Sequence, residues 1–182
     1  MRAARLGLVA LAALTVHAQE LYIPGGSVTR LATPDGSKTL YGVPYQKGSN
    51  SGPQLWIEDT RTHRRTKLFD VGGTLSAVWS ADGSAFYVND GWASDRERAY
   101  IYNAATLKRL DIAARILAED PESHRFAKGH TYFAIERWEG EHDVAVRFSG
   151  HTDEPPVTSF DIRYRVSTTG VVKKLSQHTA RL

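Results

Sequence analysis

Short runs in which apolar and polar residues alternate follow one another along most of this chain, with turns between them. The clearest runs are 143–148 and 160–166, and in the second Phe160, Ile162, Tyr164 and Val166 face one way. A period of two is typical of strands with one buried face. Helical periodicity is nearly absent, and only 112–119 has the pattern of a short helix, which Asp120-Pro121 would end. The pattern predicts an all-β fold.

The strand pattern repeats. Thr33-Pro34-Asp35-Gly36-Ser37 recurs 47 residues later as Ser80-Ala81-Asp82-Gly83-Ser84, with β-rich segments on both sides. An Asp-Gly pair in that setting favours a hairpin with a type I′ turn, in which both central residues have positive φ. Further on, 54–59 matches 98–103, and a basic strand follows each. Each unit is therefore expected to have four short strands.

A third, altered copy is expected from Phe126, where Lys128-Gly129-His130 stands in place of the Asp-Gly-Ser turn. The three repeats then cover about 28–73, 74–112 and 126–176. A period of this length is typical of propeller blades.

These residues resemble a known family. The sequence Ser/Thr-x-Asp-Gly-Ser, then a hydrophobic strand, then Leu-Trp-Ile-x-Asp, is similar to the WD40-like β-propeller repeats of TolB-type periplasmic proteins. The resemblance covers residues 30–112 and, more weakly, 126–176. It implies antiparallel four-stranded blades in a partial or small β-propeller-like fold.

Three repeats are too few for a ring, because closed propellers have about 4 to 8 blades. Three arrangements are possible. Two chains could pair into a six-bladed homodimer, Leu21-Tyr22-Ile23 could cap the array as a spare strand, or 143–166 could form a small fourth unit. We expect self-capping or a compact open stack of sheets rather than closure by dimerisation.

The first eighteen residues have the pattern of a secretory signal. Arg2 and Arg5 precede an apolar run, Leu6 to Leu14, and Val16 and Ala18 occupy the −3 and −1 positions that a signal peptidase accepts. The alternative is a buried N-terminal helix. Cleavage would leave 19–182 as a single periplasmic or secreted domain without a stable membrane anchor. Because residues 1–18 contain two arginines and no acid, the net charge of the chain would fall from +3 to +1.

Composition limits the chemistry. The absence of cysteine excludes disulfides, thiolate metal sites and cysteine nucleophiles. The sequence has no cluster of basic and aromatic residues that would predict nucleic-acid binding. The sequence has no nucleophile elbow, phosphate loop or dinucleotide fingerprint, so we expect neither an enzyme nor a cofactor.

Histidines offer a weak metal hypothesis. His130, His142 and His151 lie near acidic residues in the third repeat, and such side chains bind zinc or copper. Their spacing matches no known ligand pattern. We therefore predict no metal site and keep these three as weak candidates.

Aromatic residues at equivalent positions of the three repeats predict a binding surface. Tyr45, Trp92 and Trp138 are spaced by 47 and 46 residues, and a polar loop follows each. Repeat geometry places equivalent loops on one face. The candidate binding residues are Tyr45, Trp92, Trp138, Asp95, Arg96, Arg98 and Glu139. The alternative is that the rings pack between blades.

The function that these features predict is non-catalytic recognition of a protein or peptide partner through the repeat loops. One alternative is an envelope scaffold component that assembles through an open repeat edge. The less favoured alternative is a metal-dependent or carbohydrate-active hydrolase, with carboxylates such as Asp90, Glu97 or Glu139.

Overall fold

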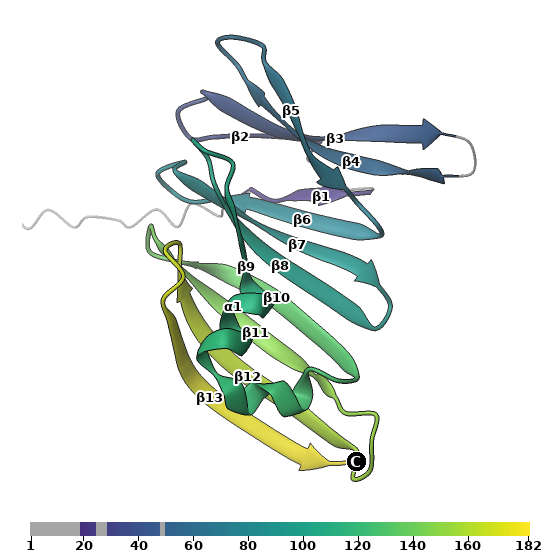
Figure 1. The fold of residues 1–182 in the computed structure, drawn as a ribbon. Helices are drawn as coiled ribbons and strands as arrows, with labels where there is room; N and C mark the ends of the chain where they lie inside the picture. Colours follow the sequence, from purple (N-terminus) through teal and green to yellow (C-terminus); the bar gives the residue numbers. More distant parts are fainter. Residues whose placement is uncertain (1–18, 25–28, 48–49) are drawn as a thin grey trace, which may run out of the picture.

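The computed structural model describes residues 19–24, 29–47 and 50–182, apart from the side chains of 45–47, 50, 51, 92 and 93. The described residues form an all-β fold of two antiparallel-rich sheets that stack without closing into a ring (Figure 1). This confirms the predicted fold class. Among the helices of these ranges, none is long and apolar enough to span a membrane.

The smaller sheet contains the first repeat. Its strands pair in chain order and all antiparallel: β2 (Arg30–Ala32), β3 (Lys38–Lys47), β4 (Asn50–Asp59) and β5 (Arg65–Asp70).

The larger sheet contains the second and third repeats. The second consists of β6 (Thr74–Trp79), β7 (Ala85–Ala93), β8 (Arg96–Asn103) and the short β9 (Arg109–Asp111). The spare strand β1 (Leu21–Ile23) pairs with β6 and covers its free edge, as expected for self-capping. The third repeat consists of β10 (His130–Glu139), β11 (Asp143–His151), β12 (Thr158–Ser167) and β13 (Val172–Arg181).

Strands β6, β7 and β8 are buried on both faces, and each face belongs to a different core. Their alternate side chains toward the smaller sheet are Leu75, Ala77, Trp79, Phe86, Val88, Tyr100 and Tyr102. The side chains between them, toward the third repeat, are Val78, Ala85, Tyr87, Ala99 and Ile101. The indole of Trp79 also donates a hydrogen bond to the carbonyl of Leu31 at 3.0 Å, which joins the two sheets. This middle group of strands therefore connects both cores.

The repeated Asp-Gly turns close two hairpins, as predicted, but the turn type differs from the prediction. Only the glycines have positive φ, +69° at Gly36 and +70° at Gly83, so these are not type I′ turns. In the first, the amide of Gly36 donates to the carbonyl of Thr33, and the amide of Thr33 donates to the carbonyl of Lys38. The loop thus has four residues, 34–37, and only Gly36, the one with positive φ, needs to be glycine.

The aspartate of each turn stabilises the turn further by accepting hydrogen bonds. Asp82 accepts hydrogen bonds from the hydroxyl of Ser80 at 2.6 Å and the amide of Ser84 at 3.0 Å. Asp35 has the same partners, Thr33 and Ser37. These bonds favour the ionised carboxylate and lower the pKa of both Asp35 and Asp82 to about 2.

The third repeat differs from the predicted blade. Helix α1 (Ile112–Glu119) forms as predicted, and the 3₁₀ helix η1 (Pro121–Phe126) follows in place of a first strand and its turn. Strand β10 then runs parallel to β8, pairing only at Thr131 and Tyr132. The strands of this repeat extend over 130–181 rather than 126–176. The 143–166 segment supplies β11 and β12 of this same sheet, not a fourth unit.

A buried polar network fixes η1 against the third repeat. The hydroxyl of Tyr164, a residue with no exposed surface, donates to Oδ2 of Asp120 at 2.8 Å and lies 2.6 Å from Oγ of Ser123. Asp120 also pairs with Nζ of Lys174 on β13 at 2.7 Å. Burial raises the pKa of Tyr164, so this hydroxyl stays protonated.

We predict that Asp82→Ala destabilises the protein at neutral pH and not in strong acid. Because the pKa of Asp82 falls from 3.8 to about 2 on folding, its contribution is present above about pH 4 and is lost as the pH falls toward 2. Thermal unfolding from pH 2 to 7 measures this. A difference between variant and wild type that stays constant down to pH 2 would contradict the assignment.

We also predict that Tyr164→Phe lowers the free energy of unfolding by about 1–2 kcal/mol, because Asp120 and Ser123 lose a buried partner. Urea unfolding measures the change. Tyr132→Phe is the matched control, since its hydroxyl donates to the carbonyl of Ser94 at the surface and its loss should cost less than about 0.5 kcal/mol. Equal effects of the two substitutions would show that the network has no special role.

Candidate functional site

Several strand ends and loops meet at one end of the sheets. Strand β8 is antiparallel to β7 and parallel to β10, so the end of β7 lies beside the beginnings of β8 and β10. The antiparallel pairs that follow bring the end of β11, the beginning of β12 and the end of β13 to the same side (Figure 1). We call this side the loop edge, formed by 94–98, 125–132, 151–158 and 178–181.

Part of the predicted binding surface lies at the loop edge. Asp95 lies in the β7–β8 turn and Arg96 begins β8, with Nε of Arg96 3.8 Å from Oδ2 of Asp95. Arg98 lies two residues on in β8. Strands β3 and β7, which carry Tyr45 and Trp92, end toward the same side in Figure 1. The side chains of Tyr45 and Trp92 lie outside the described residues.

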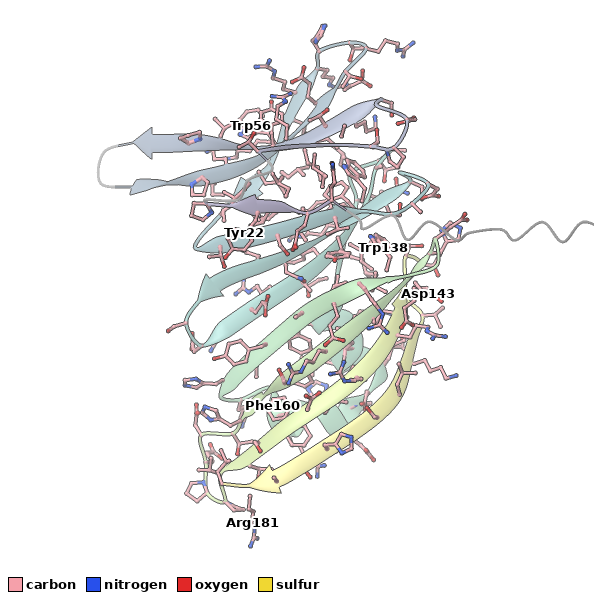
Figure 2. The ribbon with its side chains drawn as sticks, turned by 180° about the vertical axis from the view of Figure 1, so that it is seen from behind. Tyr22, Trp56, Trp138, Asp143, Phe160 and Arg181 are labelled. Carbon is pink, nitrogen blue, oxygen red and sulfur yellow. The ribbon has the colours of Figure 1, made fainter. Side chains whose placement is uncertain are left out.

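The structure does not bring Trp138 and Glu139 to this surface, which corrects the expected single face. Both lie at the end of β10, which is antiparallel to β7, so they are at the opposite edge of the sheet from Trp92. Figure 2 shows Trp138 and Asp143 at one end of the third repeat and Arg181 at the other. The physical reason is the inserted η1, which replaces one strand and so reverses the direction of those that follow.

Trp138 and Glu139 have structural partners instead. The indole of Trp138 donates to the carbonyl of Val78 at 3.3 Å, and its ring packs 5.8 Å from that of Tyr87. Glu139 pairs with Arg165 at 2.7 Å and Arg137 at 2.6 Å. The hydrogen bond from Arg165 is the largest cause of its lowered pKa.

The three histidines also separate into two places. His130 and His151 stack at the loop edge with ring centroids 4.4 Å apart, and Nδ1 of His151 is 3.7 Å from Oδ1 of Asp153. His142 lies in the β10–β11 turn at the opposite edge. Within the part of the chain that the structure describes, no three histidine or acidic side chains are grouped as metal ligands.

The β7–β8 turn is held firmly against the third repeat. The amide of Thr131 donates to the carbonyl of Asp95 at 3.0 Å, and the hydroxyl of Tyr132 donates to the carbonyl of Ser94 at 3.0 Å. The loop edge is therefore a continuous surface across two repeats, not a set of separate loops.

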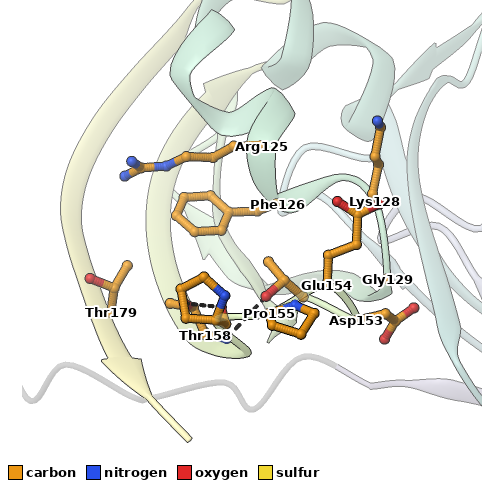
Figure 3. A pocket seen from close by; sticks show the side chains of 11 residues that line it. Arg125, Phe126, Lys128, Gly129, Asp153, Glu154, Pro155, Thr158 and Thr179 are labelled. Carbon is orange, nitrogen blue, oxygen red and sulfur yellow. Dashed lines mark hydrogen bonds between the residues drawn. The ribbon is translucent and has the colours of Figure 1, made fainter.

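A pocket of about 430 Å³ opens at the loop edge between the end of η1 and the β11–β12 loop (Figure 3). The ring of Phe126 lies inside, and the guanidinium of Arg125 covers that ring at 4.6 Å. Charges of both signs surround the apolar surface. The lining residues are Arg125, Phe126, Lys128, Gly129, Thr152, Asp153, Glu154, Pro155, Pro156, Thr158 and Thr179.

Gly129 allows the pocket to close on one side. Its φ is +118°, and a Cβ there would lie 2.6 Å from the carbonyl oxygen of His151. The chain after η1 can therefore approach the β11–β12 loop closely only with glycine at this position. Sequence reasoning placed a turn at 128–130 but did not identify the pocket, whose segments are far apart in the chain.

The carboxylates of Asp90 and Glu97 lie on neighbouring strands near the loop edge. Asp90 is only 6% exposed, and its Oδ1 is buried without a hydrogen-bond partner among the described residues. Burial raises the pKa of both groups, and the charge of Asp90 raises the pKa of Glu97 further. The charge of Arg98 lowers the pKa of Asp90, and the effect of burial outweighs it.

Likeness to known proteins is found in the structure and not in the sequence. No protein-family model matches the chain, and no curated protein matches it. Among solved structures, TolB from Acinetobacter baumannii is similar at 14% identity and a TM-score of 0.37, over 83% of this chain and 44% of that one. The chain thus spans less than half the length of that structure. A likeness this distant concerns the fold alone and says nothing of a ligand.

We predict that Asp90→Asn stabilises the protein at neutral pH by about 1 kcal/mol, since it removes a buried charge and keeps the shape. Because folding raises the pKa of Asp90 above 3.8, the ionised carboxylate destabilises the folded protein as the pH rises above that value. The stabilisation by Asp90→Asn should therefore vanish near pH 3, where the carboxyl group is mostly protonated. Urea unfolding at several pH values measures it, with the more exposed Asp95→Asn as control. A loss of stability at pH 7 would contradict the account.

Proposed function

We propose that this chain is a secreted or periplasmic, non-catalytic module that recognises a peptide or a segment of a protein partner at the loop edge. The observation that carries the proposal is the pocket beside η1. Its volume, about 430 Å³, lies within the range of ligand pockets, about 300–1,000 Å³. It is also the place where the segment after η1, the β11–β12 loop and the end of β13 converge.

The composition of the pocket suits a peptide. The exposed prolines Pro155 and Pro156 offer apolar surface to one side chain, whereas Phe126, only 3% exposed, supports the pocket from the core. Arg125 and Lys128 on one hand, and Asp153 and Glu154 on the other, offer charges to the termini, side chains or polar backbone of the same ligand. A small apolar or singly charged ligand would use only part of this set.

The proposed location follows from the N-terminal residues. Arg2, Arg5 and the apolar run that follows have the pattern of an export signal. A partner in that compartment would meet the loop edge as an exposed surface, since Lys128 and Glu154 are both exposed.

Selection from a displayed library of random dodecapeptides on the purified protein tests the proposal. We expect enriched peptides whose affinity falls at least tenfold in the pocket variant Lys128→Ala, Glu154→Ala. The matched control is Lys108→Ala, Glu141→Ala, which removes the same two charges from exposed turns away from the loop edge. The control should bind with unchanged affinity.

Two results would overturn the proposal. One is a library that yields no specific binder at micromolar affinity. The other is a set of binders whose affinity depends on the control positions and not on the pocket. Turnover of a selected peptide by the wild-type protein would contradict its non-catalytic character.

A further inference from the structure

Strand β13 offers a long edge that no strand covers in the part of the chain described here. It pairs with β12 on one side through residues 172–181 and ends the order of the larger sheet on the other. The other outer strands differ. Strands β1 and β2 have three residues each, and on β5 the cations Arg65 and Lys67 are paired with Glu58 and Asp70.

Exposed apolar side chains lie on both sides of the regular part of this edge. Among the described residues, four large hydrophobic side chains are exposed, and three of them belong to β13 or its immediate ends: Val171 at 66%, Leu175 at 47% and Leu182 at 77%. An uncovered strand with exposed apolar residues is a template for pairing with another strand. A bulge at Leu175 interrupts the register, so the regular part of the edge is 176–181.

The charge of β13 indicates which strand it would accept. The strand carries Lys173, Lys174, His178 and Arg181 and no acidic residue. Lys174 is paired with Asp120, whereas Lys173 and Arg181 have no ion pair among the described residues. Pairing of β13 with the same strand of a second copy would bring together two strands whose charges are all positive, which is unfavourable. An acidic strand would meet complementary charge.

The edge leads into the pocket. Thr179 of β13 lines the pocket, and it shares a face with Phe160, its register partner on β12. In Figure 3 the side chain of Arg125 extends toward β13, so a further cation lies near the edge. In an added strand, alternate side chains would point to the pocket side, and those between them would point to the outer face.

From these observations we propose that residues 176–181 of β13 bind an extended acidic peptide as an additional strand, with one apolar side chain of that peptide in the neighbouring pocket. The proposal rests on the proposed function and names the chemistry of its ligand. Main-chain hydrogen bonds would supply affinity, and the pocket and the cations would supply selectivity.

Two synthetic nonapeptides test this, one with glutamate alternating with valine and phenylalanine, the other with lysine in place of glutamate. Titration into the purified protein at low salt should show the acidic peptide binding at least tenfold more tightly. Its affinity should fall as salt rises. N-methylation of alternate peptide amides should abolish binding in one register and spare it in the other, because only one set of amides faces β13.

Charge variants locate the contact. Lys173→Glu, Arg181→Glu should lower the affinity for the acidic peptide at least tenfold, whereas the control Arg61→Glu, Lys108→Glu, on exposed turns elsewhere, should not. Amide hydrogen exchange should slow over 176–181 when the acidic peptide is bound. These results together would support strand addition at β13.

A failure of the β13 proposal can be distinguished from a failure of the proposed function. If library peptides bind and depend on Lys128 and Glu154, yet the acidic peptide shows no preference over the lysine peptide, the β13 proposal falls and the proposed function stands. If N-methylation has no effect in either register, strand addition is wrong. A dimer that protects the amides of 176–181 without peptide would overturn the proposal in favour of a second copy.

Discussion

The structure depends on three strands, β6, β7 and β8, that are buried on both faces. Each of these strands supplies side chains alternately to two cores, one with the smaller sheet and one with the third repeat. The aromatic rings on one face fit closely, as shown by Phe86 and Tyr102, whose rings stack at 4.9 Å. A change of register by one residue would exchange the two faces, so the packing of both cores fixes the register of these strands. This is how the described strands bury the middle repeat without closing into a ring.

The arrangement of the loops follows from the way the third repeat joins this middle group. Only two residue pairs connect β8 and β10, and the side chain of Asn89 completes the connection by bonding both the amide and the carbonyl of Ile135, each at 2.8 Å. The side chain of Asn89, which lies on β7, thereby bonds backbone groups of β10 as a neighbouring strand would do. Because β10 runs parallel to β8, the pocket and the β7–β8 turn come to one edge. Trp138 is carried to the other edge, where it packs.

Local signals in the sequence predicted the local structure well. The repeated Asp-Gly turns, the helix at 112–119 and the alternation of 160–166 are all present. Each of these depends on residues close together in the chain. The turn type was wrong because the serine or threonine two residues before each aspartate, Thr33 and Ser80, bonds its carboxylate and favours a four-residue loop.

The long-range features could not be predicted in the same way. Alignment of Trp138 with Trp92 assumed that the third repeat begins with a strand, whereas η1 occupies that position. The pocket joins 125–129, 152–158 and Thr179, and no local pattern indicates that these segments meet. Asn89 gave no signal, since its role depends on the position of β10. These features are set by packing between repeats.

Native-state hydrogen exchange, resolved by residue, tests the central claim most directly. If the middle group connects both cores, its amides, such as those of Val78, Val88 and Ile101, exchange most slowly and only by global unfolding. The amides of β2–β5 and β10–β13 should then exchange no more slowly than these. Slower exchange in the third repeat than in β6–β8, or an intermediate in which one outer sheet stays protected after the middle group has opened, would contradict the account.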